Sequence, residues 1–262
     1  MEIEGGIVKE RGAGSGLVGR LGRSLLDFAF PPVCTACGEA IGGPDALCPE
    51  CWRQLEPITA PLCPILGLPF AADMGAGATS PQAIANPPPF DRARAAVAYN
   101  DIARAIVARM KYSDRPEIAR LCGRLMAGAG HELVGPDALL VPVPLHRGRQ
   151  FLRRYNQSSE LAHVIAGLAN VALDTDLVWR RRNTARQVGL SARQRQTNVQ
   201  GAFAVRPERA QRHRGRRIVI IDDVVTTGAT VAAVAKAVQR AGFEAVDVLS
   251  FARVVFDDDM TV

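Results

Sequence analysis

Residues 219–230 read Val219-Ile220-Ile221-Asp222-Asp223-Val224-Val225-Thr226-Thr227-Gly228-Ala229-Thr230. With Ile218 before it, the opening apolar run predicts a strand buried on both faces, as in the parallel sheet of an α/β protein. Asp222 and Asp223 follow at the carboxyl end of that strand, which is where α/β folds bind their ligands. The threonine-rich turn after them contains one glycine and leads directly into a helical pattern.

This turn has the composition of an anion site. Backbone N–H groups at a helix N-terminus bind phosphate, and the hydroxyls of Thr226, Thr227 and Thr230 would add donors. The two carboxylates can accept hydrogen bonds from vicinal sugar hydroxyls, so a 5-phosphorylated ribose would satisfy both halves of the site. The alternative is an ordinary strand–turn–helix with a capping Asp or Thr. Two acids after four apolar residues, beside a T-T-G-x-T turn, favour the ligand site.

Apolar runs alternate with helical patterns from about Arg92 onward, which predicts a mostly parallel α/β sheet. The predicted strands span 95–99, 138–143, 217–221 and 246–252. The predicted helices span 101–112, 117–130, 158–169 and 229–241. Asp101 is expected to cap the first helix, and Leu161, Ile165 and Leu168 to share one face of the third.

Composition divides the 262 residues into four regions. Residues 1–30 form a leader with a short helical pattern, and residues 31–68 hold five of the six cysteines. Residues 69–91 resemble a linker, and the α/β domain is expected over 92–256. No internal repeat of useful length is apparent. No stretch approaches the roughly 18–20 apolar residues of a membrane span, and no secretory signal is apparent, so we expect a cytoplasmic protein.

The cysteines Cys34, Cys37, Cys48 and Cys51 form two C-x2-C pairs separated by ten residues. Two intervening residues place both sulfurs of a pair on one side of a tight turn, and Gly38 lets the backbone curl around the metal. Four thiolates suit tetrahedral Zn²⁺ in a closed structural site. Disulfides fit a cytosolic chain poorly, and an iron–sulfur centre is the minor alternative.

The positive charge is almost entirely arginine, because only Lys9, Lys111 and Lys236 are lysines among 32 basic residues. Residues 180–217 contain twelve arginines and one acid, Glu208, so this stretch carries +11 and the remainder of the chain −5. Such an asymmetry indicates a polyanionic partner, either a nucleic acid or a polyphosphate. A GC-rich genome or a solvated basic face would explain the same composition.

Residues 219–230 closely resemble the signature that binds 5-phosphoribosyl 1-pyrophosphate (PRPP) in the type I phosphoribosyltransferases. The resemblance implies that Asp222 and Asp223 hold the ribose hydroxyls, with Mg²⁺ bridging ribose and pyrophosphate. It also implies that the turn holds the 5-phosphate through Val225, Thr226, Thr227, Gly228, Ala229 and Thr230.

Other motifs are similar to the ComF family of competence-associated, phosphoribosyltransferase-like proteins, over about residues 25–255. They are the cysteine pairs, Lys111-Tyr112, Val141-Pro142-Val143-Pro144, Tyr155-Asn156-Gln157, and segments 180–187, 190–195 and 198–203. This resemblance implies a type I phosphoribosyltransferase fold with a small zinc-ribbon-like N-terminal module. The departure is Leu66, where many relatives carry a further C-x2-C-G, so Cys63 is not expected to bind metal.

The resemblance also assigns two loops. The loop after Val143, with Arg147 and Arg149, would contact pyrophosphate. A mobile flap over 184–198 would close on the diphosphate and exclude water; its candidate residues are Thr184, Gln187, Arg193 and Asn198. A solvated arginine surface is the alternative for individual residues of these loops.

Three functions remain open at this point. The first is Mg²⁺-dependent transfer of a phosphoribosyl group from PRPP to an unknown acceptor, since no general base for a nucleobase stands out. The second is handling of single-stranded DNA with competence-machinery proteins, although aromatic residues for base stacking make up only 5% of the chain. The third is a non-catalytic PRPP sensor that uses the same site.

Overall fold

A computed structural model describes residues 32–43, 46–75, 77–112, 116–145, 156–181 and 199–255. The predicted leader, Arg147 and Arg149 lie outside these ranges. So do the four candidate flap residues, Thr184, Gln187, Arg193 and Asn198.

The centre of the fold is a five-stranded sheet in the order β1-β7-β6-β2-β3, and every pairing in it is parallel. Its strands are β1 (Arg92–Ala98), β2 (Ala138–Pro142), β3 (Ala172–Leu173), β6 (Arg217–Val225) and β7 (Val246–Arg253). The predicted parallel α/β class is thereby confirmed. A separate antiparallel pair, β4 (Val178–Arg180) with β5 (Phe203–Val205), was not predicted.

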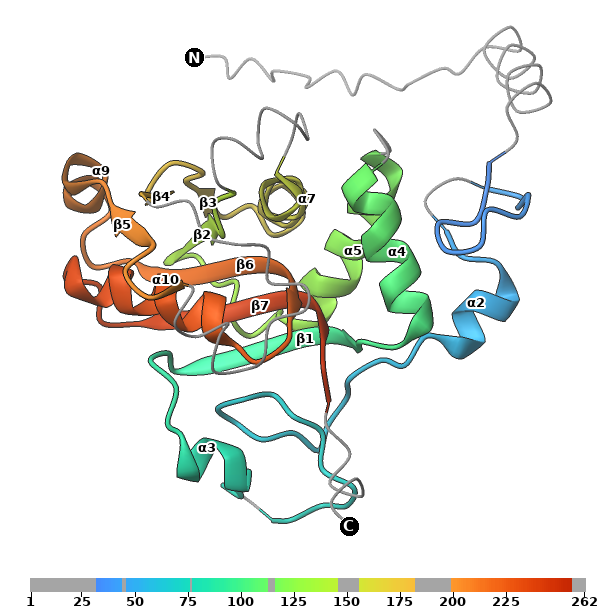
Figure 1. Cartoon of the computed structure of the whole chain (residues 1–262), viewed down its shortest axis with the longest axis horizontal. Coiled ribbons are helices and arrows are strands. Elements are labelled where there is room, and N and C mark those ends of the chain that lie inside the picture. The colour runs from blue at the N-terminus through green and yellow to red at the C-terminus, as the bar shows by residue number, and fades with distance from the viewer. Residues whose placement is uncertain are drawn as a thin grey trace, which may run out of the picture.

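Helices cover both faces of the sheet (Figure 1). On one face lie α4 (Asp101–Tyr112), α5 (Pro116–Ala129) and α7 (Gln157–Ala169). The other face carries α10 (Ala229–Arg240), and the short helix α9 (Pro207–Arg212) precedes β6. Side chains alternate along a strand, so Val219 and Ile221 enter the core under α4, α5 and α7, while Ile218 and Ile220 enter the core with α10.

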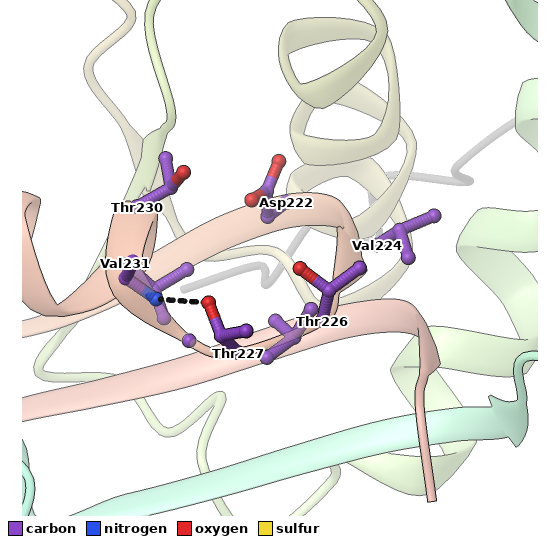
Figure 2. A pocket seen from close by; sticks show the side chains of 9 residues that line it. Asp222, Val224, Thr226, Thr227, Thr230 and Val231 are labelled. Atoms are coloured by element: carbon purple, nitrogen blue, oxygen red, sulfur yellow. Dashed lines mark hydrogen bonds between the residues drawn. The ribbon is translucent and has the colours of Figure 1, made fainter. Parts of the chain in front are cut away.

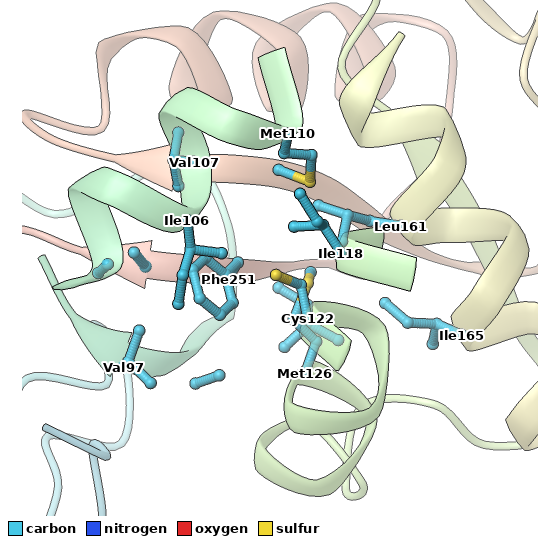
Figure 3. Close-up of a cluster of buried hydrophobic side chains, with 14 of the residues drawn as sticks. Val97, Ile106, Val107, Met110, Ile118, Cys122, Met126, Leu161, Ile165 and Phe251 are labelled. Atoms are coloured by element: carbon cyan, nitrogen blue, oxygen red, sulfur yellow. The ribbon is translucent and has the colours of Figure 1, made fainter. Parts of the chain in front are cut away.

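Figure 3 shows the first of these cores, where α4, α5 and α7 meet the sheet. The buried side chains labelled there come from three helices and two strands: Val97, Ile106, Val107, Met110, Ile118, Cys122, Met126, Leu161, Ile165 and Phe251. The thiol of Cys122 is a core side chain, because the residue is fully buried among them. These contacts hold the carboxyl end of α4 and the start of α7 against the sheet.

Several predicted details are corrected. The cap of α4 is Asn100, whose Oδ1 accepts a hydrogen bond from Ala103 N at 3.0 Å, whereas Asp101 is the first residue of the helix. Leu168 is 56% exposed and does not share the buried face of α7. The predicted linker contains a short helix, α3 (Pro81–Ala85).

The N-terminal module straddles the β1 edge of the sheet. Its first part, with α2 (Pro49–Gln54), contributes Cys34, Cys48 and Cys51 to the core of α4 and α5, and Figure 1 shows α2 beside α4 and α3 on the other side of β1. The second part of the module, residues 61–85, contains α3. In the segment that joins the two parts, Ile58 N donates to Ala96 O at 3.0 Å, so this segment pairs with the edge strand β1.

Residues 61–85 repeat the backbone hydrogen bonding of residues 33–54. The expectation of no internal repeat is therefore wrong. Within the described ranges, no helix combines the length and apolarity that crossing a bilayer demands.

Candidate functional site

The candidate ligand site lies where the order of strands reverses. The chain runs outward through β2, α7 and β3, then crosses to β6 and continues the other way through α10 and β7. The reversal falls between β2 and β6, where Val143 N donates to Ile221 O at 2.9 Å. Open α/β sheets bind ligands at the carboxyl ends of strands at such a point. The sequence-predicted acids and turn lie there.

A small open pocket is formed almost entirely by the turn between β6 and α10. It is lined by Asp222, Val224, Val225, Thr226, Thr227, Gly228, Ala229, Thr230 and Val231. Figure 2 shows the side chains of Thr226, Thr227 and Thr230 along the turn and the Asp222 carboxylate beside them. All six residues of the predicted 5-phosphate turn thus belong to one pocket.

Gly228 sets the geometry of this turn. Its φ of 75° lies in the left-handed region that disfavours side chains, and it stands at the N-cap of α10 without a side-chain cap. Thr227 Oγ1 accepts a hydrogen bond from Ala229 N at 3.5 Å (Figure 2). The first turn of α10 contains no acid, so its N–H groups and helix dipole favour an anion in the pocket.

Asp222 is a buried carboxyl group on β6. Its Oδ1 accepts hydrogen bonds from Ser158 Oγ at 3.2 Å and from Asp223 N at 3.0 Å. Burial, followed by repulsion from the neighbouring Asp223, raises the pKa of Asp222 to about 8. Near neutral pH, this group can therefore exchange a proton when a cation or a ligand hydroxyl approaches.

Asp223 has a different environment from Asp222. Its Oδ2 lies 2.9 Å from Nζ of Lys111 at the end of α4, and its Oδ1 accepts a hydrogen bond from Val224 N at 2.8 Å. Burial opposes the charge on Lys111, but attraction to Asp223 outweighs it and raises the pKa of Lys111. Asp222 lines the pocket and Asp223 does not. The resemblance to the type I phosphoribosyltransferases implies that both acids meet the ribose, and that shared role stays a prediction.

Lys111 and Ser158 are partners of the acids that sequence reasoning did not assign. The sequence signal for Lys111 is its rarity, because it is one of three lysines in an arginine-rich chain. Ser158 carries no such signal, because it lies in the first turn of an ordinary helical pattern. The structure gives no geometry for Arg147, Arg149 or the flap, which fall outside the described residues.

A second site is formed by the four N-terminal cysteines. One Sγ from each of Cys34, Cys37, Cys48 and Cys51 lies within 4.8 Å of the others. Zinc at about 2.3 Å from four sulfurs sets them about 3.8 Å apart, and Cys37 Sγ lies 3.7 Å from Cys48 Sγ. These residues form a structural Zn²⁺ site, as predicted, and all four positions are filled by protein sulfurs.

Backbone groups stabilise thiolates at this site. Cys48 N donates to Cys34 Sγ at 3.3 Å, and Gly38, with φ of 88°, closes the first knuckle by donating to Cys34 O at 3.0 Å. Burial opposes ionisation of Cys34, but backbone hydrogen bonds from Cys48, Cys37 and Ala36 outweigh it and lower its pKa to about 6. Burial and the neighbouring thiols raise the pKa of Cys51, so zinc binding to the full set of four thiolates releases protons.

Comparison with known proteins gives one domain match and several relatives. A family model described as "Double zinc ribbon domain" matches residues 25–82. The chain is 33% identical to the "DNA utilization protein YhgH" of Escherichia coli (strain K12) over 234 residues, 86% of this chain and 99% of that protein. The protein of the same name from Salmonella typhimurium is 33% identical over 238 residues, 88% of this chain and 94% of that protein. "Competence protein F" of Haemophilus influenzae is 32% identical over 154 residues, 56% of this chain and 66% of that protein.

Proposed function

The chain belongs to the ComF family, which includes the DNA utilization protein YhgH and competence protein F, and on this premise we propose that it binds PRPP with Mg²⁺. In this proposal the protein transfers the phosphoribosyl group to an acceptor of unknown identity. The names of the relatives support a role in the uptake or use of DNA. A cytoplasmic location would keep the four zinc thiols reduced.

The observation that carries this proposal is the shared pocket of Asp222 and the threonine turn. The turn would hold the 5-phosphate through N–H groups at the start of α10, and the carboxyl of Asp222 would accept a hydrogen bond from a ribose hydroxyl. Both halves of one ligand are thereby recognised by adjacent residues. A free phosphate or a helix cap would engage only the turn.

The acids and Lys111 set the charge of the site. Asp222 and Asp223 would hold the ribose hydroxyls, and Mg²⁺ bound with the ligand would supply positive charge to the leaving pyrophosphate. Lys111 already neutralises Asp223 at 2.9 Å. Asp222 would release its proton when the metal–ligand complex binds, because a cation favours the carboxylate. Arg147 and Arg149 belong to the proposal as contacts of pyrophosphate, and the flap as the cover that excludes water.

Transfer is tested by measuring pyrophosphate release from PRPP and Mg²⁺ in the presence of nucleobases, amines and single-stranded DNA in turn. We expect one acceptor class to accelerate release, and Asp222→Asn/Asp223→Asn to abolish that acceleration. The matched control is Asp101→Asn, which removes an exposed carboxylate on α4 that pairs with Arg104. Release that is equal in all three proteins would contradict the transferase proposal.

A second candidate is a non-enzymatic protein that handles single-stranded DNA, favoured by the names of the relatives. Part of the basic segment is engaged inside the protein: Arg209 pairs with Asp174 at 2.7 Å and Arg217 with Asp247 at 3.0 Å. This pairing reduces the charge available to a phosphate backbone. The affinity for short single strands is measured against salt concentration, with and without PRPP. Competition between DNA and PRPP would place both ligands in one cleft, whereas DNA binding that PRPP does not change would place them in separate sites.

A PRPP sensor would use the same pocket without turnover. It predicts tight binding of PRPP with no pyrophosphate release in the acceptor screen. The screen and a binding measurement together therefore distinguish sensor from transferase.

A further inference from the structure

The N-terminal module contains the same pattern twice. Positions 34, 37 and 38 recur at 63, 66 and 67, an offset of 29 residues, and positions 48, 49 and 51 recur at 80, 81 and 83, an offset of 32. Cys34-x2-Cys37-Gly38 thus corresponds to Cys63-x2-Leu66-Gly67. The second half of the pattern, Cys48-Pro49-Glu50-Cys51, corresponds to Ser80-Pro81-Gln82-Ala83. Among the four metal-binding positions, only the first keeps its cysteine.

The knuckles of the two halves have the same backbone geometry. Gly38 N donates to Cys34 O at 3.0 Å, and Gly67 N donates to Cys63 O at 2.8 Å. Both glycines have positive φ, 88° and 64° respectively. An antiparallel bridge closes each knuckle, Val33 with Ala40 and Leu62 with Pro69. The second knuckle keeps a metal-binding backbone although Leu66 replaces a ligand.

The second pair of positions also matches in space. Each begins a short helix with proline in its first turn, α2 after Cys48 and α3 after Ser80. Cys48 N donates to Cys34 Sγ at 3.3 Å, and Ser80 N donates to Cys63 Sγ at 3.4 Å. The same backbone N–H thus reaches the same sulfur position in both halves, which coincidental loop structure would not produce.

The side chains at the second centre do not form a zinc site. Cys63, Leu66, Ser80 and Ala83 are all buried, and together they offer one thiol and one hydroxyl where structural zinc requires four ligands. Ser80 Oγ donates to Cys63 Sγ at 3.3 Å. Among the described residues, the Cys34 cluster is the single group of three or more His, Cys, Asp or Glu side chains arranged to hold a metal.

Arg253 supplies the positive charge near this centre. The residue lies at the end of β7, and its Nη1 donates to Leu66 O at 2.7 Å. Its Nε is buried without a hydrogen-bond partner in the described structure. Burial lowers the pKa of Arg253 to about 10, although its interaction with Cys63 acts in the opposite direction. The Cys63 thiol accepts three hydrogen bonds, from Leu66 N and from Ser80 N and Oγ, and it interacts electrostatically with Arg253.

We infer that residues 61–85 are a second zinc ribbon that has lost its metal and is held by apolar packing, the Ser80–Cys63 hydrogen bond and Arg253. Cys63, Leu66 and Ala83 join the core formed with α10, on the face of the sheet opposite to the zinc-binding half. A Cβ on Gly67 would lie 2.2 Å from Ala93 O on β1, so the knuckle sits directly against the sheet. Packing on the α/β domain thus takes over the stabilising role of zinc.

The inference predicts the zinc content of the full-length chain. Purified wild type should hold one zinc per chain by elemental analysis, and Cys63→Ser should also hold one. Cys37→Ser is the matched variant in the first half and should lose the zinc. Two zinc ions in wild type, or loss of zinc from Cys63→Ser, would overturn the inference.

Restoring the absent ligands tests the repeat itself. The variant Leu66→Cys/Ser80→Cys/Ala83→Cys should hold two zinc ions per chain, because the backbone already has the geometry of a ribbon. Co²⁺ substitution should roughly double the thiolate charge-transfer absorbance of wild type, since each closed site contributes four Co–S bonds. A folded triple variant, with wild-type circular dichroism, that still binds one metal would contradict the inference.

Discussion

Asp222 combines three features that structural carboxyl groups seldom share: burial, an adjacent acid and a place in a pocket. Ser158 Oγ and Asp223 N donate to the same oxygen, Oδ1. Desolvation and the neighbouring charge nevertheless dominate and raise its pKa to about 8. A raised pKa of this kind is typical of functional sites.

The pKa of Asp222 makes stability depend on pH. In the unfolded chain this carboxyl ionises near pH 4, whereas in the folded protein it keeps its proton until about pH 8. The contribution of Asp222 to the free energy of unfolding is therefore fully present below pH 4, and it is lost as pH rises from 4 through 8. Relative to Asp222→Asn, wild type should lose at most about 1.4 kcal/mol per pH unit over this window. Urea unfolding at pH 5 and pH 8.5 measures the difference.

The control for this prediction is Asp101→Asn, which removes a carboxylate whose side chain is 90% exposed. Its stability difference from wild type should stay constant between the two pH values. A pH-independent difference for Asp222→Asn as well would show that its proton is lost at an ordinary pKa.

Lys111 is the partner of Asp223 at 2.9 Å. Lys111→Met should lower the free energy of unfolding at pH 7 by roughly 1–3 kcal/mol, since it leaves a half-buried carboxylate beside Asp222 without its cation. Urea unfolding measures this loss, and Lys111→Arg should recover part of it. Lys236→Met removes an exposed lysine of α10 and serves as the control. Equal losses in the two Met variants would contradict a specific role for Lys111.

At the scale of elements, the turn between β6 and α10 should decide phosphate affinity. Thr226→Val/Thr230→Val keeps the shape of both side chains and removes two hydroxyls of the pocket. We expect ribose 5-phosphate to bind at least about tenfold more weakly, because each hydrogen bond to a charged group contributes about 1.5 kcal/mol or more. Calorimetric titration measures the change, with Thr79→Val, an exposed hydroxyl bonded to Gly77 O, as control. Unchanged affinity would remove these hydroxyls from the ligand site.

The same element shows what the sequence could predict. The apolar run before Asp222 was sufficient to predict a buried strand, and the glycine among threonines to predict the turn. The strand was expected to end at Ile221, but β6 continues to Val225 because Asp222, Val224 and Val225 pair with Ser250, Ala252 and Arg253 of β7. Such pairing depends on a distant segment and overrides the low strand preference of aspartate.

The capping residue of α4 could not be predicted from the sequence alone either. Asp101 and Asn100 are both suitable caps, and the choice depended on the path of the chain out of β1, which places Asn100 Oδ1 against Ala103 N. Lys111 was not recognised as a partner of Asp223 because the two residues lie far apart in the sequence. Only the packing of α4 on the sheet brings them together.

For the whole molecule, the alternation of strands and helices was enough to predict the parallel α/β class, and two C-x2-C pairs to predict one zinc site. The repeat within the module was missed because three of four ligands had been replaced, which leaves Cys63, Gly67 and Pro81 as its remaining traces. The backbone of residues 61–85 keeps the geometry of a zinc ribbon, whereas a sequence motif can be recognised only from the ligand residues, which have changed.

Zinc should hold the first half of the module onto α4 and α5. Cys34, Cys48 and Cys51 lie in the core that contains Ile106, so removal of zinc by a chelator should expose residues 33–54 to protease. The described strands and helices between β1 and β7 should resist digestion, because the sheet pairing and the core with α10 contain none of the four zinc ligands. Mass spectrometry of a limited digest locates the cuts, and protection should return when zinc is restored. Cuts spread evenly over both regions would contradict this division.

The proposed phosphoribosyl pocket is tested most directly by calorimetric titration of the zinc-loaded full chain with PRPP and Mg²⁺. The account predicts saturable one-site binding to wild type and to Asp101→Asn. Binding to Asp222→Asn/Asp223→Asn should be weaker by about tenfold or more, since each carboxylate contributes a charge-assisted hydrogen bond. No binding by wild type, or equal affinity in the double variant, would contradict it.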